Sequence, residues 1–265
     1  MTTLSRRMFL SAGAATLAMG VRPAEAIEDH ALPTDLVRGE VATVTNIRTT
    51  TPVVAMTFDD GPHPSLTPKL LDTLRKRRMR ATFYLIGRSV VTWPDIVKRI
   101  AEEGHEIGNH TWSHPNMAGL GDAAMFEQID RTNDAIFKVT GRPPVTFRPP
   151  YGSFTLRQRK LLYEKRGMPT VLWSVDPLDW RRPGADVVKS RILEQTYPGS
   201  IILSHDIHSA TVQAMPDTFD GLLDRGMRFG SLSQMVGWPL WQMRGFQRVA
   251  GHFKPTGRPD LLRLQ

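Results

Sequence analysis

Residues 52–86 read PVVAMTFDDGPHPSLTPKLLDTLRKRRMRATFYLI. The apolar runs at 52–58 and 81–86 have the length and composition of buried strands. Between them, leucines 70, 71 and 74 fall on one face of a helix that begins after Thr67-Pro68. A strand, a helix and a second strand make the unit from which parallel sheets are built. This stretch therefore predicts an α/β fold.

The same alternation of strand and helix continues along the chain, roughly seven times in all. Apolar runs predict further strands at 105–109, 145–148, 170–175, 200–204 and 227–229. Helical periodicity predicts helices at 95–103, 156–166, 186–195 and 211–224, and one that ends before Gly141. The pattern fits an open doubly wound sheet or a closed barrel, and periodicity does not choose between them.

The composition limits the class of protein. A length of 265 residues fits one large domain. With 40% hydrophobic and 23% charged residues, the chain is not disordered, collagen-like or a polytopic membrane protein. Cysteine is absent, which excludes disulfides, thiolate zinc sites and cysteine nucleophiles, so a metal would need His, Asp or Glu. The formal charge of +8 favours anionic surroundings, and a polyanionic envelope would serve as well as nucleic acid.

Residues 1–26 have the features of an export signal. Arg6-Arg7 precede a weakly apolar run at 8–19, and Ala24-Glu25-Ala26 offers a cleavage site. The run is shorter than the roughly 20 residues of a membrane-spanning helix, so no transmembrane anchor is expected. We interpret the segment as a twin-arginine signal peptide rather than a short amphipathic helix. This predicts an exported protein, periplasmic or extracellular, whose formal charge falls from +8 to +6 on cleavage.

The rest of the chain divides into three parts. Residues 27–51 are an N-terminal extension, 52–237 the main domain and 238–265 a basic tail. In the tail, five basic residues against Asp260 alone give a net charge of +4, with Pro and Gly scattered throughout. We interpret it as a solvated extension, with contact to an anionic polymer as the alternative.

Two adjacent carboxylates follow the first strand, in Thr57-Phe58-Asp59-Asp60-Gly61-Pro62. The carboxyl ends of parallel strands are where α/β folds place their sites. Neighbouring carboxylates resist joint ionisation unless a cation lies between them or one is tied to a base. A metal ion would explain the pair; a solvated turn that closes a strand is the alternative.

Two histidines, in His110-Thr111-Trp112-Ser113-His114, follow the strand expected at 105–109. In a helical turn, their spacing of four places both rings on one side, suited to one ion. Such a pair is a weak signal alone. Since it projects from the same sheet edge as the two carboxylates, the combination predicts a metal site.

Five motifs now stand in order: 57–62 (TFDDGP), 110–114 (HTWSH), 148–152 (RPPYG), 176–180 (DPLDW) and 203–206 (LSHD). Together they closely resemble the motifs of the polysaccharide deacetylase family, also called the NodB-homology domain or carbohydrate esterase family 4. The resemblance covers about residues 53–236. It implies a single-domain, distorted (β/α)7-type TIM-like barrel with its site in a groove at the carboxyl ends of the strands.

The resemblance also implies roles for single residues. Asp60, His110 and His114 would be the ligands of one divalent ion, with an open position for water. Zinc is the expected metal, with cobalt, nickel or manganese as alternatives. Asp59 would be the general base, and Arg148 would hold it ionised and oriented.

The later motifs would complete the catalytic machinery. The backbone N–H of Tyr151 would stabilise the oxyanion. His205 would be the general acid, charged through a neighbouring carboxylate, with Asp179 favoured over Asp176 as its partner. The pocket for the acetyl methyl group and the sugar face would be walled by Trp180 and Leu203.

The other histidines are expected to be structural or on the surface; they are His63, His105, His208 and His252. Asp206 is expected to serve the loop that follows His205.

The resulting hypothesis is a metal-dependent hydrolase that cleaves a linear amide, removing acetyl groups from N-acetylated amino sugars of a polymer and releasing acetate. Peptidoglycan, at N-acetylglucosamine or N-acetylmuramic acid, is the first expected substrate, and a chitooligosaccharide is the second. The expected partners are this glycan and the twin-arginine export machinery, with no nucleic acid, and the expected state is a monomer. The alternatives are an O-acetyl esterase of the xylan type and a catalytically silent carbohydrate-binding protein of the same fold.

Overall fold

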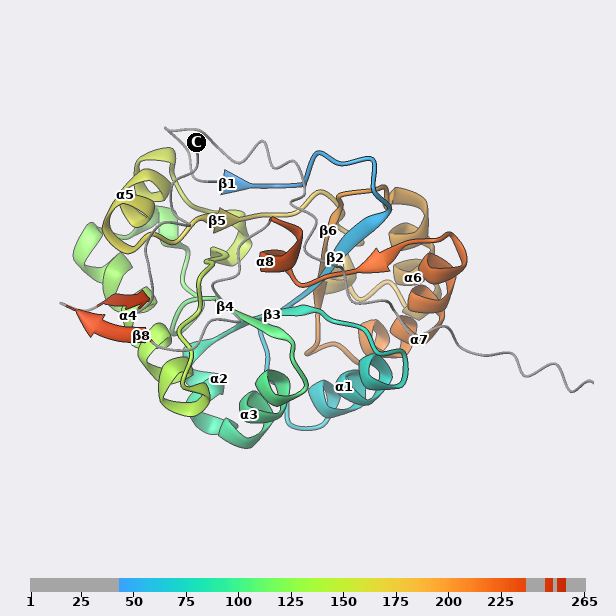
Figure 1. Ribbon diagram of the computed structural model, residues 1–265, viewed down its shortest axis with the longest axis horizontal. Coiled ribbons are helices and arrows are strands. Elements are labelled where there is room, and N and C mark those ends of the chain that lie inside the picture. The colour runs from blue at the N-terminus through green and yellow to red at the C-terminus, as the bar shows by residue number, and fades with distance from the viewer. Residues whose placement is uncertain (1–42, 237–245, 250–251, 256–265) are drawn as a thin grey trace, which may run out of the picture.

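The computed structural model describes residues 43–236, 246–249 and 252–255. A parallel sheet runs through its centre in the strand order β4-β3-β2-β6 (Figure 1). Every residue of β2 is buried, which explains why the run at 52–58 lacks polar alternation. A short strand, β7, pairs with the start of β2. The bounds of these strands are β2 Val53–Asp59, β3 Thr82–Leu85, β4 Glu106–Asn109, β6 Ile201–His205 and β7 Arg228–Phe229.

Single-residue bridges extend the pairing around the molecule. Phe147 bridges both β4 and β5 (Thr170–Val171), and Val175 bridges β6. β5 also pairs with β1 (Thr43–Val44). The pairing therefore runs from β6 through β2, β3 and β4 to Phe147 and β5, and the chain that follows β5 meets β6 at Val175. The α/β class with parallel strands is confirmed, whereas the seven-unit barrel stays a prediction.

The strand expected at 145–148 is shortened to a single residue, Phe147, which forms the bridges to β4 and β5. Pro143-Pro144 and Pro149-Pro150 flank this segment. Prolines lack the N–H group that a ladder needs, so the segment cannot extend its pairing in either direction. The strand expected at 170–175 is likewise shortened to β5 and the bridge at Val175.

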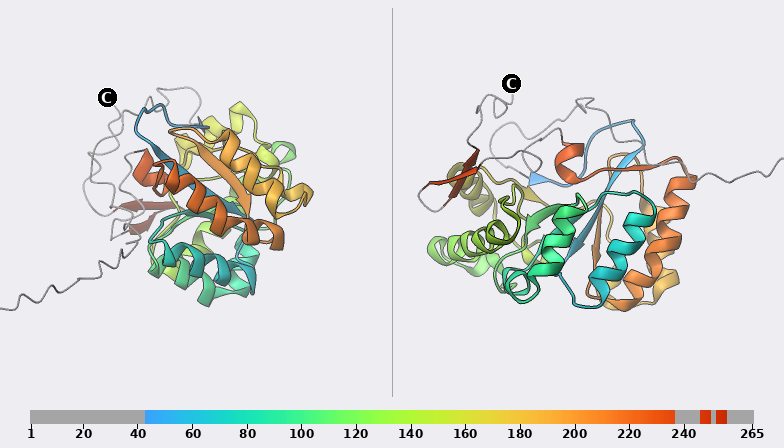
Figure 2. Two further views of the ribbon diagram at one scale, coloured as in Figure 1. Left: turned by 90° about the vertical axis from the view of Figure 1, so that its right-hand side faces the viewer. Right: turned by 60° about the horizontal axis from the view of Figure 1, so that its bottom comes forward.

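Helices pack side by side around the sheet. α6 packs against α7, α7 against α1, α1 against α3, and α3 against α4 (Figure 2). The leucines of α1 lie in the same buried core as Phe58 of β2 and Phe83 of β3. The bounds of the helices are α1 Leu66–Lys76, α2 Gly87–Thr92, α3 Pro94–Glu102, α4 Asp122–Thr140, α5 Leu156–Arg166, α6 Ala185–Gln195, α7 Ser209–Asp224 and α8 Leu232–Met235.

Some elements were not expected from the sequence. α2 and α8 are too short to show helical periodicity, and β1 lies within the expected N-terminal extension. Within the basic tail, β8 (Phe246–Val249) pairs antiparallel with β9 (His252–Pro255). The expected signal peptide lies outside the described residues. None of the helices in the described part of the chain has the length and apolar character needed to cross a membrane.

Gly199→Ala is expected to lower the free energy of unfolding by about 3 kcal/mol. Gly199 has φ +85, and an added Cβ would collide with the carbonyl oxygen of Ile47. Gly167→Ala is the control: Gly167 has φ +66, and no heavy atom lies within 4 Å of an added Cβ. Gly167→Ala adds only backbone strain, so its free energy of unfolding is expected to fall by about 1 kcal/mol. Urea denaturation measures both, and equal losses would show that the collision has no effect.

Candidate active site

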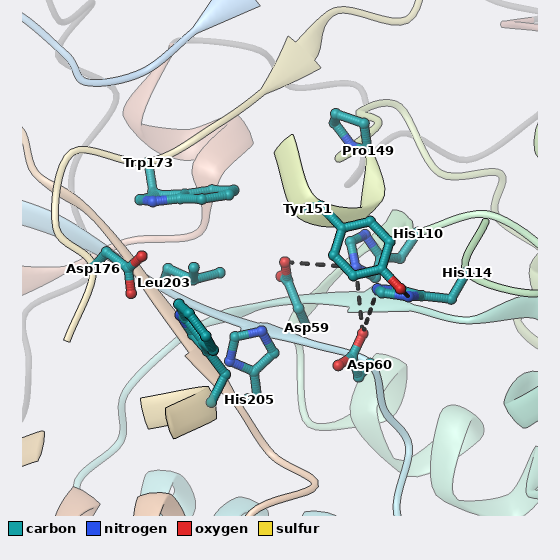
Figure 3. A pocket seen from close by; sticks show the side chains of 11 residues that line it. Asp59, Asp60, His110, His114, Pro149, Tyr151, Trp173, Asp176, Leu203 and His205 are labelled. Carbon is teal, nitrogen blue, oxygen red and sulfur yellow. Dashed lines mark hydrogen bonds and ion pairs between the residues drawn. The ribbon is translucent and has the colours of Figure 1, made fainter. Parts of the chain in front are cut away.

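Parallel register brings the motif residues to one edge of the sheet. Asp59, the last residue of β2, is the register partner of His205, the last residue of β6. His110 directly follows β4, which is separated from β6 by the two strands β3 and β2. Their side chains meet in one pocket at the carboxyl ends of the strands (Figure 3). The motif residues therefore lie at the carboxyl ends of the strands, where the sequence predicts them.

The carboxylate of Asp60 faces two imidazoles (Figure 3). Its Oδ1 lies 3.4 Å from Nε2 of His110 and 3.2 Å from Nε2 of His114. Burial alone would raise the pKa of Asp60, but the two histidines bring it well below its usual value. Oδ1 is buried and accepts no well-formed hydrogen bond from the described residues.

These three side chains fit a divalent cation. Their ligand atoms all lie within 4.8 Å of one another. Two imidazole nitrogens and one carboxylate oxygen are a donor set typical of zinc and related transition metals, unlike the oxygen ligands of calcium or magnesium. A buried carboxylate oxygen without a hydrogen bond is costly unless a positive charge compensates it. The structure thus contains a possible Asp-His-His metal site.

The prediction of a helical turn across residues 110–114 is wrong. The segment is a loop in which Thr111 (φ 70) and His114 (φ 61) both have left-handed backbone conformations. The side-chain oxygen of Asn109 accepts a hydrogen bond from the N–H of Thr111. The hydroxyl of Thr111 accepts one from the N–H of His114. Short-range hydrogen bonds, rather than a helix, therefore place the two rings.

Contacts behind the rings decide which nitrogen of each histidine faces Asp60. Nδ1 of His110 donates a 2.7 Å hydrogen bond to the carbonyl oxygen of Arg148. Nδ1 of His114 lies 3.2 Å from the hydroxyl of Tyr151. In both cases Nε2 is directed at the carboxylate. Such outer contacts orient imidazole ligands and fix their tautomer.

Arg148 is fully buried and holds Asp59. Its Nη1 donates to Oδ1 of Asp59 and to the hydroxyl of Thr57, both at 2.7 Å, and its guanidinium lies 4.2 Å from the ring centre of Tyr84. The ion pair compensates two buried charges. The second carboxylate oxygen of Asp59 lies 3.8 Å from Nε2 of His110, beside the possible metal site. A base that abstracts a proton from water there needs this arrangement.

His205 pairs with Asp179, not with Asp176. Oδ1 of Asp179 lies 2.8 Å from Nδ1 of His205, and its Oδ2 accepts hydrogen bonds from the backbone N–H of His205 and the hydroxyl of Thr211. Asp176 instead accepts from the N–H of Leu178. Burial alone would lower the pKa of His205, but the hydrogen bond and charge of Asp179 raise it to about 9. The imidazole is therefore positively charged at neutral pH.

The pocket has a volume of about 420 Å³. Trp180 and Leu203 line it, as expected, and so does Tyr151, which is 70% exposed and has φ 60. Trp173 and Pro149 also line it and were not foreseen as pocket residues. No motif marks Trp173, because its place depends on the path of the chain after β5.

The contacts of Asp206 extend beyond the loop that follows His205. Its buried carboxylate accepts a hydrogen bond from the hydroxyl of Thr67 on α1. The same carboxylate lies against Gly61, directly after Asp60. Burial raises the pKa of Asp206 to about 7. Asp206 therefore connects the end of β6 to the loop that carries a possible metal ligand.

The remaining histidines have varied surroundings. Nδ1 of His63 accepts hydrogen bonds from the first turn of α1, and Nδ1 of His105 accepts one from the N–H of Ala81, so both are structural. The ring of His208 lies 5.8 Å from that of His205, next to the pocket. The side chain of His252 lies outside what the structure describes.

Gly61→Ala is expected to weaken metal binding about 10- to 100-fold. An added Cβ would lie 2.6 Å from Oδ1 of Asp206, so either the loop or the carboxylate must move. Gly119→Ala is the control, because an added Cβ there meets no heavy atom within 4 Å. Titration of both metal-free variants with zinc measures the effect, and equal affinities would contradict it.

Known proteins are similar to most of this chain. A family model described as polysaccharide deacetylase matches residues 46–170. A chitooligosaccharide deacetylase from Sinorhizobium fredii is 36% identical over 206 residues, which are 72% of this chain and 95% of that protein. The chain belongs to the polysaccharide deacetylase family. The resemblance drawn from the five motifs is thereby confirmed.

Other members of the polysaccharide deacetylase family are similarly close. The peptidoglycan-N-acetylglucosamine deacetylase PgdA of Listeria monocytogenes is 40% identical over 187 residues. These are 71% of this chain but only 39% of that relative. The crystal structure of the Bc1960 peptidoglycan N-acetylglucosamine deacetylase matches with a TM-score of 0.73 and 37% identity, covering 76% of this chain and 95% of that one.

Proposed function

We propose that this chain is a metal-dependent hydrolase that removes acetyl groups from N-acetylated amino sugars of a polysaccharide and releases acetate. One observation carries the proposal: a buried base, a possible metal site and a charged histidine open into the same pocket. Peptidoglycan, at N-acetylglucosamine or N-acetylmuramic acid, is the first proposed substrate, and a chitooligosaccharide is the second. The names of the relatives support both choices.

Asp60, His110 and His114 would hold one divalent ion, with zinc as the first choice. When bound, the ion would polarise the acetyl carbonyl and make a water molecule more acidic. Asp59 accepts the proton of the attacking water through its free oxygen. Arg148 keeps that carboxylate ionised and fixes its orientation.

His205 donates a proton to the departing nitrogen, which leaves as the free amine. The positive charge that Asp179 stabilises on His205 makes this proton available at neutral pH. The backbone N–H of Tyr151 stabilises the negative charge that develops on the acetyl oxygen. A charged acid favours an amide substrate over an O-acetyl ester, because the nitrogen must be protonated to leave.

The same proposal includes export through the twin-arginine pathway and action as a monomer outside the cytoplasm. Arg6-Arg7, the short apolar run and the small-residue cleavage site support the export. Replacing both arginines by lysine should stop export, and unchanged accumulation outside the cytoplasm would contradict the assignment.

Acetate release from a substrate panel tests the function. The purified protein is loaded with Zn²⁺, Co²⁺, Ni²⁺ or Mn²⁺ and incubated with chitooligosaccharides, peptidoglycan and acetylxylan. Acetate from the N-acetylated glycans is the expected result. Acetate from acetylxylan alone would show an O-acetyl esterase, and glycan binding without acetate under every metal would show a silent binding protein.

A further inference from the structure

A short 3-10 turn, η3 (Asp179–Arg181), places a positive charge at the rim of the pocket. Asp179, the first residue of the turn, is bonded to His205. Trp180, the second, lines the pocket and is 46% exposed. The guanidinium carbon of Arg181, the third, lies 4.7 Å from the ring centre of Trp180. One turn thus carries the hydrogen-bond partner of His205, a residue that lines the pocket and a guanidinium group.

A second arginine follows immediately. Arg182 is exposed, has φ 55 and donates its backbone N–H to the carbonyl oxygen of Asp179. Its charge acts on His208: burial lowers the pKa of that histidine, Asp179 opposes the shift, and the charges of His205 and Arg182 add to it. Arg182 therefore directly follows the turn that carries Trp180, one of the residues that line the pocket.

Neither arginine has an acidic partner among residues 43–236. Elsewhere on the surface, Arg157 pairs with Asp122 and Arg75 pairs with Asp72. At the rim, the carboxylate of Asp179 is buried and already accepts hydrogen bonds from His205 and Thr211. Asp176, which also lines the pocket, accepts from the N–H of Leu178. Two adjacent positive charges without a counter-charge attract an anion that approaches the pocket.

We propose that Arg181 and Arg182 form a subsite for a carboxylate on the glycan, next to the sugar whose acetyl group is removed. The proposal rests on the proposed function and narrows its substrate to an anionic N-acetylated glycan. A guanidinium binds a carboxylate through two parallel hydrogen bonds, and contact with the Trp180 ring holds Arg181 ready for it. A carboxylate of the stem peptide, or of the lactyl ether where no stem peptide is attached, gives peptidoglycan this chemistry, whereas chitooligosaccharides are neutral.

The test compares two glycans and two double variants. The rim variant is Arg181→Gln with Arg182→Gln. The control, Arg75→Gln with Lys76→Gln, removes the same charge from exposed positions at the carboxyl end of α1. For solubilised peptidoglycan, the rim variant should lose about 10- to 100-fold in kcat/KM, mainly through KM, because two charge-assisted contacts are lost. For an N-acetylglucosamine oligomer, it should change less than about twofold.

Esterified peptidoglycan completes the test. Esterification removes the carboxylate charges. The kcat/KM of the wild-type protein should then no longer exceed that of the rim variant, and the kcat/KM of the rim variant should not fall further. An equal loss of the rim variant on charged and neutral glycans, or no loss on peptidoglycan, would overturn the subsite. If neither glycan yields acetate, the proposed function fails, and calorimetric binding of the same glycans to the wild-type and rim variants still decides the subsite.

Discussion

Asp59→Asn is expected to lower acetate release about 10²- to 10⁴-fold while the protein still binds zinc. The amide keeps the size and shape of the carboxylate but accepts no proton from water. The possible metal ligands Asp60, His110 and His114 are unchanged. Acetate release at neutral pH, together with the zinc content of the purified variant, measures both effects.

His110→Ala separates the two roles. It removes a possible metal ligand and should abolish both bound zinc and turnover, whereas Asp59→Asn should abolish only turnover. Asp59→Asn also removes a negative charge beside the buried guanidinium of Arg148, so circular dichroism must show that the variant is folded. Near-full turnover of a folded, zinc-loaded Asp59→Asn protein would mean that another group is the base.

Asp179→Asn is expected to lower turnover at pH 8 about 10²-fold and to move the alkaline limb of the pH profile to lower pH. The pKa of His205 is raised to about 9 from a usual 6.5, burial opposing the hydrogen bond and charge of Asp179. Without that charge, burial dominates and the imidazole loses its proton at lower pH. Asp179 is not one of the possible metal ligands, so its effect persists when a cation is bound.

The same shift has a consequence for stability. Because the pKa of His205 is higher in the folded protein, the stabilisation that its charge provides is complete below about pH 6.5 and is lost as the pH rises through about 9.

For the effect of Asp179→Asn on turnover, Asp176→Asn is the control, since Asp176 lines the same pocket without contacting His205. Measurement of kcat/KM from pH 5 to 10 compares the two variants. Identical profiles for both would exclude the Asp179–His205 pair as the source of the alkaline limb.

Sequence alone predicted the elements whose signals are local. α5 begins and ends at the expected residues because Thr155 forms a capping box with Gln158 and Gly167 ends the helix in a left-handed conformation. Long buried strands such as β2 were equally clear. The strand at 145–148 was predicted too long, because an apolar run does not show whether the flanking residues can supply hydrogen bonds.

In the candidate site, too, the sequence predicted what local signals reveal. It predicted that the motif residues lie together, because parallel strands end at one edge of the sheet. The turn at 110–114 was misjudged, since a spacing of four residues does not reveal that Asn109 and Thr111 hold a loop. The partner of Asp206 on α1 and the pocket wall at Trp173 depend on contacts between distant segments, which one sequence does not encode visibly.

Several side chains of the site stand on backbone that L-amino acids rarely adopt. Asp60, Thr111, His114 and Tyr151 have φ values of 75, 70, 61 and 60. Each such residue costs on the order of 1 kcal/mol or more, which the surrounding fold must offset. Selection for thermal tolerance alone would therefore favour glycine at these four positions and would erode the chemistry, so a search for hardier variants of this enzyme should leave them fixed.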